Sequence, residues 1–444
     1  MDDDLQGDVK DSGWYEWALT AFYISYIGFE WMALLWKIVP PHIYISVLVM
    51  SWGLTASLQA VALNYPMLIV LRGFLGIGEA GFTGVPFYLS FFFKRHELAF
   101  RTAIFISAAP LATSFASSLA WVIMRLGQNS PIAPWRLLFL VEGFPSVLIA
   151  AIAWQVIPDS PQTASYLTTR ERKVARLRLR HENPSTRTSK EAGGKSSGLN
   201  AREIFAVLTD PVAWLTAAIF FLTNMAYSSM PVFLPTILTA MGHSALSAQA
   251  LAAPPYLASF FIVLSTAYAS DAGRSRSPWL IGSAILSSLG YGALALTGSR
   301  FVRVDPGSLL RYLAVYPATI GFFNVVVLTV AWSLNNQRGA SRQGGGFALL
   351  QAVGQCGPLV GTRLYPDREG PYYERGMTVC AAAMLAVAVL AVVLRLYLRR
   401  LNRKLDEAEG HVDGIEGPEE EGEALVAGGR VGLQQQDKAF RYLL

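Results

Sequence analysis

The stretch that decides the fold runs from Pro66 to Lys94 and reads PMLIVLRGFLGIGEAGFTGVPFYLSFFFK. It is long and apolar enough to cross a bilayer, which takes about 20 residues, yet it contains Arg72 and Glu79. At about 1.5 Å of rise per residue, Arg72 lies about 9 Å and Glu79 about 20 Å from Pro66, on either side of the midplane of a ~30 Å hydrocarbon core. A charge at that depth costs at least about 2.5 kcal/mol. We therefore expect both side chains to face a polar cavity inside a membrane protein.

The composition of the whole chain agrees with a membrane protein. Of its 444 residues, 53% are apolar and only 15% are charged, whereas a soluble domain carries about 25% charged residues. Cys356 and Cys380 fall in apolar segments, so no disulfide framework is expected. The histidines show no ligand spacing, and no phosphate-binding glycine loop occurs, so we expect neither a metal nor a cofactor. The basic residues lie between apolar segments, which argues against nucleic-acid binding.

Hydropathy windows of about 19 residues predict an all-α polytopic membrane protein with about eleven transmembrane helices. Five precede a polar loop and six follow it: 14–37, 42–63, 66–92, 101–124 and 137–157, then 211–238, 246–270, 278–297, 309–334, 344–364 and 377–398. The expected domains are an N-terminal extramembrane segment (1–13), a first lobe (14–157), a central loop (158–208), a second lobe (209–398) and a disordered tail (399–444).

Charge predicts the sidedness of these segments. Arginine and lysine gather in the central loop, after residue 398 and in alternate short connections, whereas most of the opposite connections carry few charges. By the positive-inside rule, the central loop and the C-terminus are cytoplasmic. We expect a monomer that spans the lipid bilayer of the plasma membrane. Within the central loop, Thr168 and Glu171 have the spacing of a capping box, which predicts a helix start. That basic helix lies either against anionic lipid or in solvent.

Several motifs together are similar to one family. LRGFLGIGEAGFTGVPFYLSFFFKRHELAFRTA resembles the fourth-span signature of the anion:cation symporter family of the major facilitator superfamily. APWRLLFLVEGFPSVLIA resembles the family's sixth-span motif, and IPDSPQTASYLTTRERKVARLRLR resembles the segment after it. SDAGRSRS looks like the superfamily's cytoplasmic clasp. The residues of these motifs are most similar to the fungal allantoate/nicotinate/pantothenate permease branch of that family. The resemblance implies a two-lobed transporter, and it also implies that the family's first span has no counterpart in this chain.

Arg72 and Glu79 are the main site candidates. An arginine presents a planar fork to a carboxylate, so Arg72 is expected to bind substrate, the role that the resemblance also gives it. Alternatively, Arg72 only pairs with Glu79 to hold two helices together. Glu79 is the expected proton-coupling residue, since a proton that neutralises it would free Arg72 for an anion. The alternative is a fixed salt bridge. The small residues beside these charges, Gly73, Gly76, Ala80 and Gly84, are interpreted as a helix-packing stripe.

Other polar residues within the predicted spans are weaker candidates. Glu30 either lines the cavity as a second proton-coupling residue or hydrogen-bonds a neighbouring helix. Glu142 is interpreted as a structural link. Tyr227 and Asn324 are the expected substrate contacts from the second lobe. They are chosen from six polar residues, each of which more often only joins helices: Asn224, Tyr227, Tyr256, Asn324, Gln351 and Gln355.

Asp271, Arg274 and Arg276 are expected to form a gating clasp, with an ordinary basic loop as the alternative. The resulting expectation is a secondary active transporter, not an enzyme, that imports a small organic anion with protons by alternating access. The substrate would be a carboxylate such as a vitamin or ureide. The alternative from another class is a substrate sensor or an inactive, shortened paralogue that transports nothing.

Overall fold

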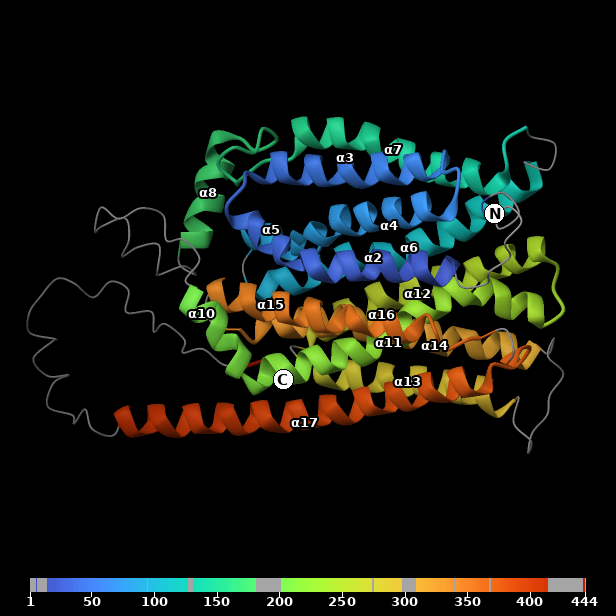
Figure 1. Ribbon diagram of the computed structural model, residues 1–444. Coiled ribbons are helices and arrows are strands. Elements are labelled where there is room, and N and C mark those ends of the chain that lie inside the picture. The colour runs from blue at the N-terminus through green and yellow to red at the C-terminus, as the bar shows by residue number, and fades with distance from the viewer. Residues whose placement is uncertain are drawn as a thin grey trace, which may run out of the picture.

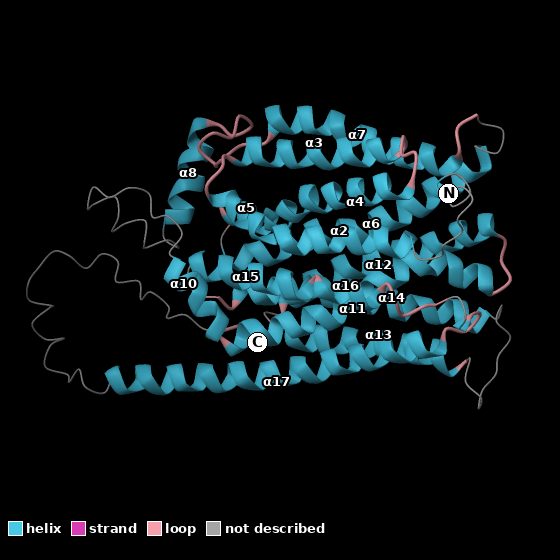
Figure 2. Ribbon diagram, in the orientation of Figure 1, coloured by secondary structure: helices cyan, strands magenta, loops and turns pink. Residues whose placement is uncertain are grey.

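The computed structural model describes residue 5 and residues 14–93, 95–126, 131–180, 201–273, 275–297, 309–337, 340–366, 369–413 and 442–443. All regular elements in these residues are helices (Figures 1 and 2). Their order along the chain is α2 (Trp14–Phe29), η1 (Glu30–Lys37), α3 (Pro41–Gln59), α4 (Tyr65–Ala80), η2 (Gly81–Gly84), α5 (Val85–Ser90), α6 (Arg95–Leu126), α7 (Pro134–Val156), α8 (Thr169–Arg180), α10 (Ala201–Ala206), η4 (Val207–Thr209), α11 (Pro211–Ala240), α12 (Ala245–Ala272), α13 (Ser277–Leu296), α14 (Leu309–Asn335), α15 (Ala340–Gly354), α16 (Cys356–Gly361) and α17 (Glu374–Asp413).

Ten of the described helical segments are long and apolar enough to cross a membrane, which confirms the all-α polytopic class. The one predicted span that is not among these ten, 344–364, is broken into α15 and α16 around Gln355. Pro358 explains the break, because it has no N–H to donate to the carbonyl of Gly354 four residues earlier. Residues 340–361 still extend over about 33 Å if they are counted as one continuous helix. The two pieces together are therefore long enough to span a bilayer.

The decisive stretch folds as three helical pieces in place of one. Asn64 caps the start of α4, accepting a hydrogen bond from the backbone N–H of Met67 at 3.0 Å. After Ala80 the helix tightens into the 3₁₀ segment η2, and α5 then begins with Pro86 near its start. Proline cannot donate to the preceding turn, so the α-helical ladder is interrupted here. The indole of Trp36 donates to the carbonyl of Gly81 at 2.7 Å and stabilises this tightened turn.

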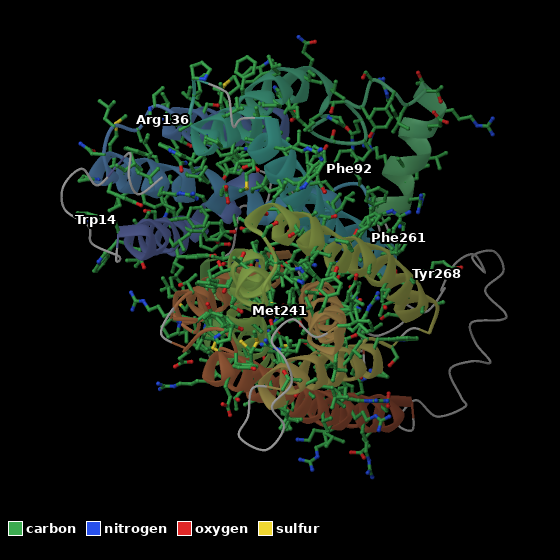
Figure 3. All side chains as sticks on the ribbon, turned by 90° about the vertical axis from the view of Figure 1, so that its right-hand side faces the viewer. Trp14, Phe92, Arg136, Met241, Phe261 and Tyr268 are labelled. Carbon is green, nitrogen blue, oxygen red and sulfur yellow. The ribbon has the colours of Figure 1, made fainter. Side chains whose placement is uncertain are left out.

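The membrane helices form two groups that lie side by side. In Figure 1 the first group, α2 to α7, occupies the upper part of the bundle, and the second group, α11 to α17, occupies the lower part. The two groups meet where α12 and α14 pack against α6. Figure 3 shows the bundle from one end, with Phe261 and Tyr268 of α12 at its outer surface. Both side chains are exposed, as expected for residues that face lipid.

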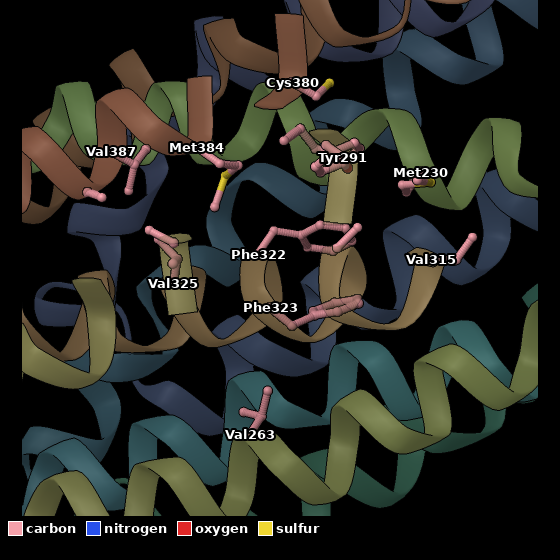
Figure 4. Close-up of a cluster of buried hydrophobic side chains, with 14 of the residues drawn as sticks. Met230, Val263, Tyr291, Val315, Phe322, Phe323, Val325, Cys380, Met384 and Val387 are labelled. Carbon is pink, nitrogen blue, oxygen red and sulfur yellow. The ribbon is translucent and has the colours of Figure 1, made fainter. Parts of the chain in front are cut away.

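The larger hydrophobic core lies within the second group. Aromatic side chains of α14 form its centre, where the ring centres of Phe322 and Phe323 lie 4.8 Å apart (Figure 4). Tyr291 of α13 is buried beside them, and its hydroxyl donates to the carbonyl of Ala226 on α11 at 2.9 Å. Because Tyr291 is fully buried, this hydrogen bond avoids the cost of an unsatisfied hydroxyl group. The core thus fixes α11, α13 and α14 relative to one another.

Small residues bring α2 and α4 into backbone contact, as the glycine stripe predicts. A Cβ atom added to Gly76 would lie 2.4 Å from the backbone carbonyl oxygen of Phe22 on α2. In the segments that follow the two helices, a Cβ atom added to Gly84 of η2 would lie 2.2 Å from the Trp36 ring of η1. A Cβ atom added to Gly73 would lie 3.3 Å from the hydroxyl oxygen of Ser25 on α2. No side chain fits at Gly76 unless α2 moves. The packing interpretation of the stripe is confirmed.

The capping box of the central loop is also confirmed. The Glu171 carboxylate accepts hydrogen bonds from the backbone N–H and the hydroxyl of Thr168, both at 2.8 Å. These bonds, the backbone one first, lower the pKa of Glu171 below its usual value of 4.5. The following helix α8 is exposed and carries the basic residues at one end of the bundle (Figure 1). Residues 181–200 of the predicted central loop and most of the predicted tail lie outside the described residues, but residues 399–413 of that tail continue helix α17 and are therefore not disordered.

We expect Gly76→Ala to destabilise the protein by about 1–3 kcal/mol, the typical cost of overpacking a filled contact. Gly28→Ala on α2 is the matched control, because no atom lies within 4 Å of the added Cβ. Thermal unfolding of both purified variants measures the difference. Equal unfolding temperatures would contradict the close contact between α2 and α4.

We expect the start of α8 to open as the pH falls. Because the folded pKa of Glu171 lies below the unfolded one, its stabilisation is present above pH 4.5 and is lost as the pH falls through the lowered value. Amide protection factors of residues 169–173, measured by hydrogen exchange, should drop on acidification. In Glu171→Gln, which keeps an acceptor but cannot titrate there, the drop should disappear. A drop of equal size in both proteins would contradict the role of the carboxylate.

Candidate functional site in the cavity between the helix groups

A cavity of about 560 Å³ lies between the two helix groups. It is mostly apolar and aromatic, with a few polar side chains, as is common for small-molecule sites. The first group contributes its walls from α2 through α6, and the second group closes it with α14 and α15. The residues that line it are Tyr26, Trp52, Glu79, Phe82, Thr83, Pro86, Phe105, Ile106, Ala108, Ala109, Ala112, Val330, Phe347 and Gln351.

Glu79 is the carboxylate among these lining residues. It lies in the last turn of α4, just before the helix tightens into η2. Its charge acts on two tyrosines from opposite helix groups, Tyr26 of α2 and Tyr227 of α11. An ionised carboxylate in such apolar surroundings is costly unless it binds a proton or a counter-charge. Glu79 is thus placed where a proton or a ligand could reach it.

Glu30 lies behind the wall of the cavity. It is 2% exposed, and its Oε1 atom accepts a hydrogen bond of 2.6 Å from the hydroxyl of Thr83, which itself lines the cavity. Of the two expected arrangements, the structure shows the hydrogen bond to a neighbouring helical segment. The Oε2 atom of Glu30 is buried, with no hydrogen-bond partner among the described residues. A protonated carboxyl could occupy this place at a lower cost than an ionised one.

Arg72 does not line the cavity. Its guanidinium lies over the ring of Phe139 on α7, 5.3 Å from the ring centre. Its charge acts on Glu79 and also on Glu142, an exposed residue of α7. In this conformation Arg72 therefore links α4 to α7, while its field still reaches the cavity carboxylate.

The second-group candidates are placed differently from one another. Gln351 lines the cavity, and its Oε1 atom is buried, with no hydrogen-bond partner among the described residues. Tyr227 lies outside the lining and packs edge-on against Phe322 and Phe323, with ring centres 5.7 and 5.3 Å apart. Asn324 is 3% exposed on α14 and also lies outside the lining. Of these three residues, therefore, Gln351 lines the same cavity as Glu79, whereas the two preferred candidates, Tyr227 and Asn324, do not.

The expected gating residues pair within one turn. Arg276 forms an ion pair with Asp271, and its other terminal nitrogen donates to the Ser270 hydroxyl at 3.1 Å. Burial lowers the pKa of Arg276 to about 10, so it stays charged at neutral pH. Asp271 lies in the last turn of α12 and Arg276 directly precedes α13, so the described contacts of this ion pair stay within the second helix group. Arg274 lies outside the described residues.

Sequence reasoning missed most of the aromatic lining. Trp52, Phe82, Phe105 and Phe347 come from four different elements and meet only at the cavity. The sequence of a span alone does not distinguish an aromatic side chain that faces a cavity from one that faces lipid. Pro86, seven residues after Glu79, is a local signal for a helix break at this site, because proline has no N–H to donate to the preceding turn.

Comparison with known proteins places this arrangement in a family. The model of the Major Facilitator Superfamily matches residues 1–362. The MFS transporter prlL of Fungal sp. (strain NRRL 50135) is 30% identical over 409 residues, which cover 90% of this chain and 79% of that protein. The major facilitator-type transporter hxnP of Emericella nidulans is 28% identical and covers 92% of this chain and 81% of its own length.

A solved structure supports the fold. The proton:xylose symporter XylE, bound to 6-bromo-6-deoxy-D-glucose, superposes with a TM-score of 0.65 over 88% of this chain and 87% of that chain. At 14% identity this likeness concerns the fold alone. Together with the family match, the helices and the central cavity describe a secondary transporter rather than an enzyme. The chain is a multi-pass membrane protein that belongs to the major facilitator superfamily.

Proposed function

We propose that this protein is a proton-coupled symporter that carries a small organic carboxylate, such as a vitamin or ureide, by alternating access. The observation that carries the proposal is the position of Glu79, which lines a cavity between the two helix groups within the field of Arg72. A symporter needs a group that can bind a proton next to the substrate, and Glu79 meets that requirement. Thr83 connects the same cavity to the buried carboxyl of Glu30, which would be a second proton site.

Proton binding to Glu79 would change the electrostatics of the cavity. A neutral Glu79 no longer competes with a substrate carboxylate for the positive charge of Arg72, and an arginine offers two parallel N–H donors to such a carboxylate. Arg72 would have to leave the ring of Phe139 to reach the substrate. In that arrangement proton and anion enter together, and neither charge crosses the membrane alone. Tyr227 and Asn324 would contact the substrate only after the second helix group has shifted.

The finer assignments rest on the sequence. We place the protein in the anion:cation symporter branch, as a monomer in the plasma membrane. The central loop and the C-terminus would be cytoplasmic, and the lobes would be 14–157 and 209–398. The exposed basic helix α8 supports this orientation, because positive charge is retained on the cytoplasmic side.

A carrier of neutral or cationic compounds is the second candidate. One observation favours it: the cavity lining contains Glu79 but not Arg72. An ionised Glu79 would attract a cation, and the aromatic side chains of Trp52, Phe105 and Phe347 can stack on a neutral ring. The identity of the transported charge therefore decides between the two candidates.

We expect Glu79→Gln to reduce substrate-driven proton uptake into proteoliposomes at least tenfold. Exchange of substrate across the membrane should persist in this variant. Glutamine keeps the size and polarity of the side chain but cannot carry the proton. A pH-sensitive dye inside the vesicles reports proton entry when nicotinate, pantothenate or allantoate is added outside.

Glu142→Gln is the matched control, because Glu142 also feels the charge of Arg72 but lies outside the cavity lining. It should leave proton uptake unchanged. Coupling through Glu79 would be wrong if both variants behaved alike. If no probe moved protons or was itself taken up by the unmodified protein, a non-transporting sensor would be the better interpretation.

We expect Arg72→Lys to remove the preference for a carboxylate over its amide, because lysine cannot form the bidentate contact. The measurement compares uptake of nicotinate and nicotinamide, which differ only in that group. The unmodified protein should prefer nicotinate, and the variant should lose at least tenfold of that preference. A preference for nicotinamide in the unmodified protein would support the carrier of neutral or cationic compounds.

A further inference from the structure

The chain returns to the helical bundle at Tyr442 and Leu443, near the C mark in Figure 1. These two residues lie between the last turns of α14 and the extension of α17 beyond residue 398. Residues 414–441, which connect them to α17, lie outside the described part of the chain. The contacts of Tyr442 and Leu443 with α14 and α17 therefore join residues that are far apart in the sequence.

Two asparagine side chains hold the backbone of this pair. Asn402 of α17 accepts from the N–H of Tyr442 at 2.8 Å and donates to its carbonyl at 2.9 Å. Asn336, just after α14, accepts from the N–H of Leu443 at 2.7 Å and donates to its carbonyl at 3.1 Å. A side-chain amide that binds both backbone groups of one residue replaces the neighbouring strand of a sheet. All four backbone polar groups of the pair are satisfied in this way.

A buried tryptophan completes the site. The indole N–H of Trp332 donates to the Leu443 carbonyl at 2.8 Å, and the Trp332 side chain is fully buried. Asn336 is 3% exposed. Without the Leu443 carbonyl, the indole N–H would lose this acceptor in a buried place, which is costly. The ring of Tyr442 packs against the larger hydrophobic core, so the segment adds apolar contact as well as hydrogen bonds.

We propose that Trp332, Asn336 and Asn402 form a peptide-binding site whose occupant is the chain's own segment Tyr442–Leu443. The site recognises an extended backbone, with an aromatic residue at the first position. By holding this segment, it joins the end of α14 to α17. Because Val330 of α14 lines the cavity one half-turn before Trp332, an occupied site restrains the helix that closes the transport cavity. Only this last consequence rests on the proposed function; the binding site does not.

A direct test uses a chain shortened to residue 437 and a fluorescein-labelled peptide of residues 438–444, KAFRYLL. Fluorescence anisotropy should show saturable binding to the shortened chain. The 444-residue chain should bind the peptide at least tenfold more weakly, because its own tethered segment competes at a high effective concentration. N-methylation of the peptide at the Tyr442 nitrogen should weaken binding at least tenfold, since it removes the donor to Asn402. Equal binding to both chains, or none to the shortened chain, would overturn the proposal.

Variants of the protein separate recognition by Asn402 from a general effect on α17. In the shortened chain, Asn402→Ala should weaken peptide binding at least tenfold. Arg403→Ala is the matched control, because its exposed side chain pairs with Glu407. It should leave binding unchanged, and equal losses in both variants would contradict the site.

A second measurement applies if the shortened chain does not fold. The 444-residue chain is treated with a carboxypeptidase, and the released residues are followed by mass spectrometry. Release of Leu443 and Tyr442 should be at least tenfold faster from Asn402→Ala than from the unmodified protein or Arg403→Ala. Equal release rates from all three proteins would overturn the proposal as well.

Discussion

The hydrocarbon core of a membrane supplies no hydrogen-bond partners, and the arrangement of this protein depends on that constraint. Most buried hydroxyl groups in the spans bond to their own helix: Thr216 to the carbonyl of Val212, Thr223 to that of Ile219, and Ser259 to that of Pro255. Twelve buried side-chain nitrogen or oxygen atoms have no hydrogen-bond partner among the described residues. Two of them, in Glu30 and Gln351, lie at or just behind the cavity wall.

The two helix groups differ in how far they are buried. In α14, 78% of the most apolar window is buried, whereas in α7 and in the first span the figure is 17%. The second group therefore has a well-filled core of its own around Phe322 and Phe323. The first group supplies most of the cavity wall and contacts its neighbours through small residues such as Gly76.

Helix α14 takes part in each of these features. Its middle forms the core with Tyr227 and Tyr291, and Val330 reaches the cavity. It also packs against α6 of the other group. At its end, Trp332 and Asn336 bind the segment that returns from beyond α17. A change at that end can therefore be transmitted along one continuous helix to the cavity.

The sequence by itself determined the properties that depend on neighbours along the chain. Hydropathy located the spans, the spacing of Gly73, Gly76 and Gly84 predicted the backbone contact, and Thr168 with Glu171 predicted the start of α8. The charges of Arg72 and Glu79 at mid-span predicted a polar cavity, because a charged side chain is costly against lipid. The cavity that Glu79 lines is instead mostly apolar and aromatic, and Arg72 lies outside its lining.

Only the tertiary structure decided which residues meet from different helices. Arg72 and Glu79 are seven residues apart on one helix, yet the Arg72 guanidinium lies over the ring of Phe139 on α7, outside the cavity lining. The contacts of Trp52, Phe105 and Phe347 at one cavity, and of Asn336 and Asn402 with Leu443 and Tyr442, likewise cross long distances in the sequence. Such contacts are set by how whole helices pack, because packing direction depends on all the side chains between them rather than on any local pattern.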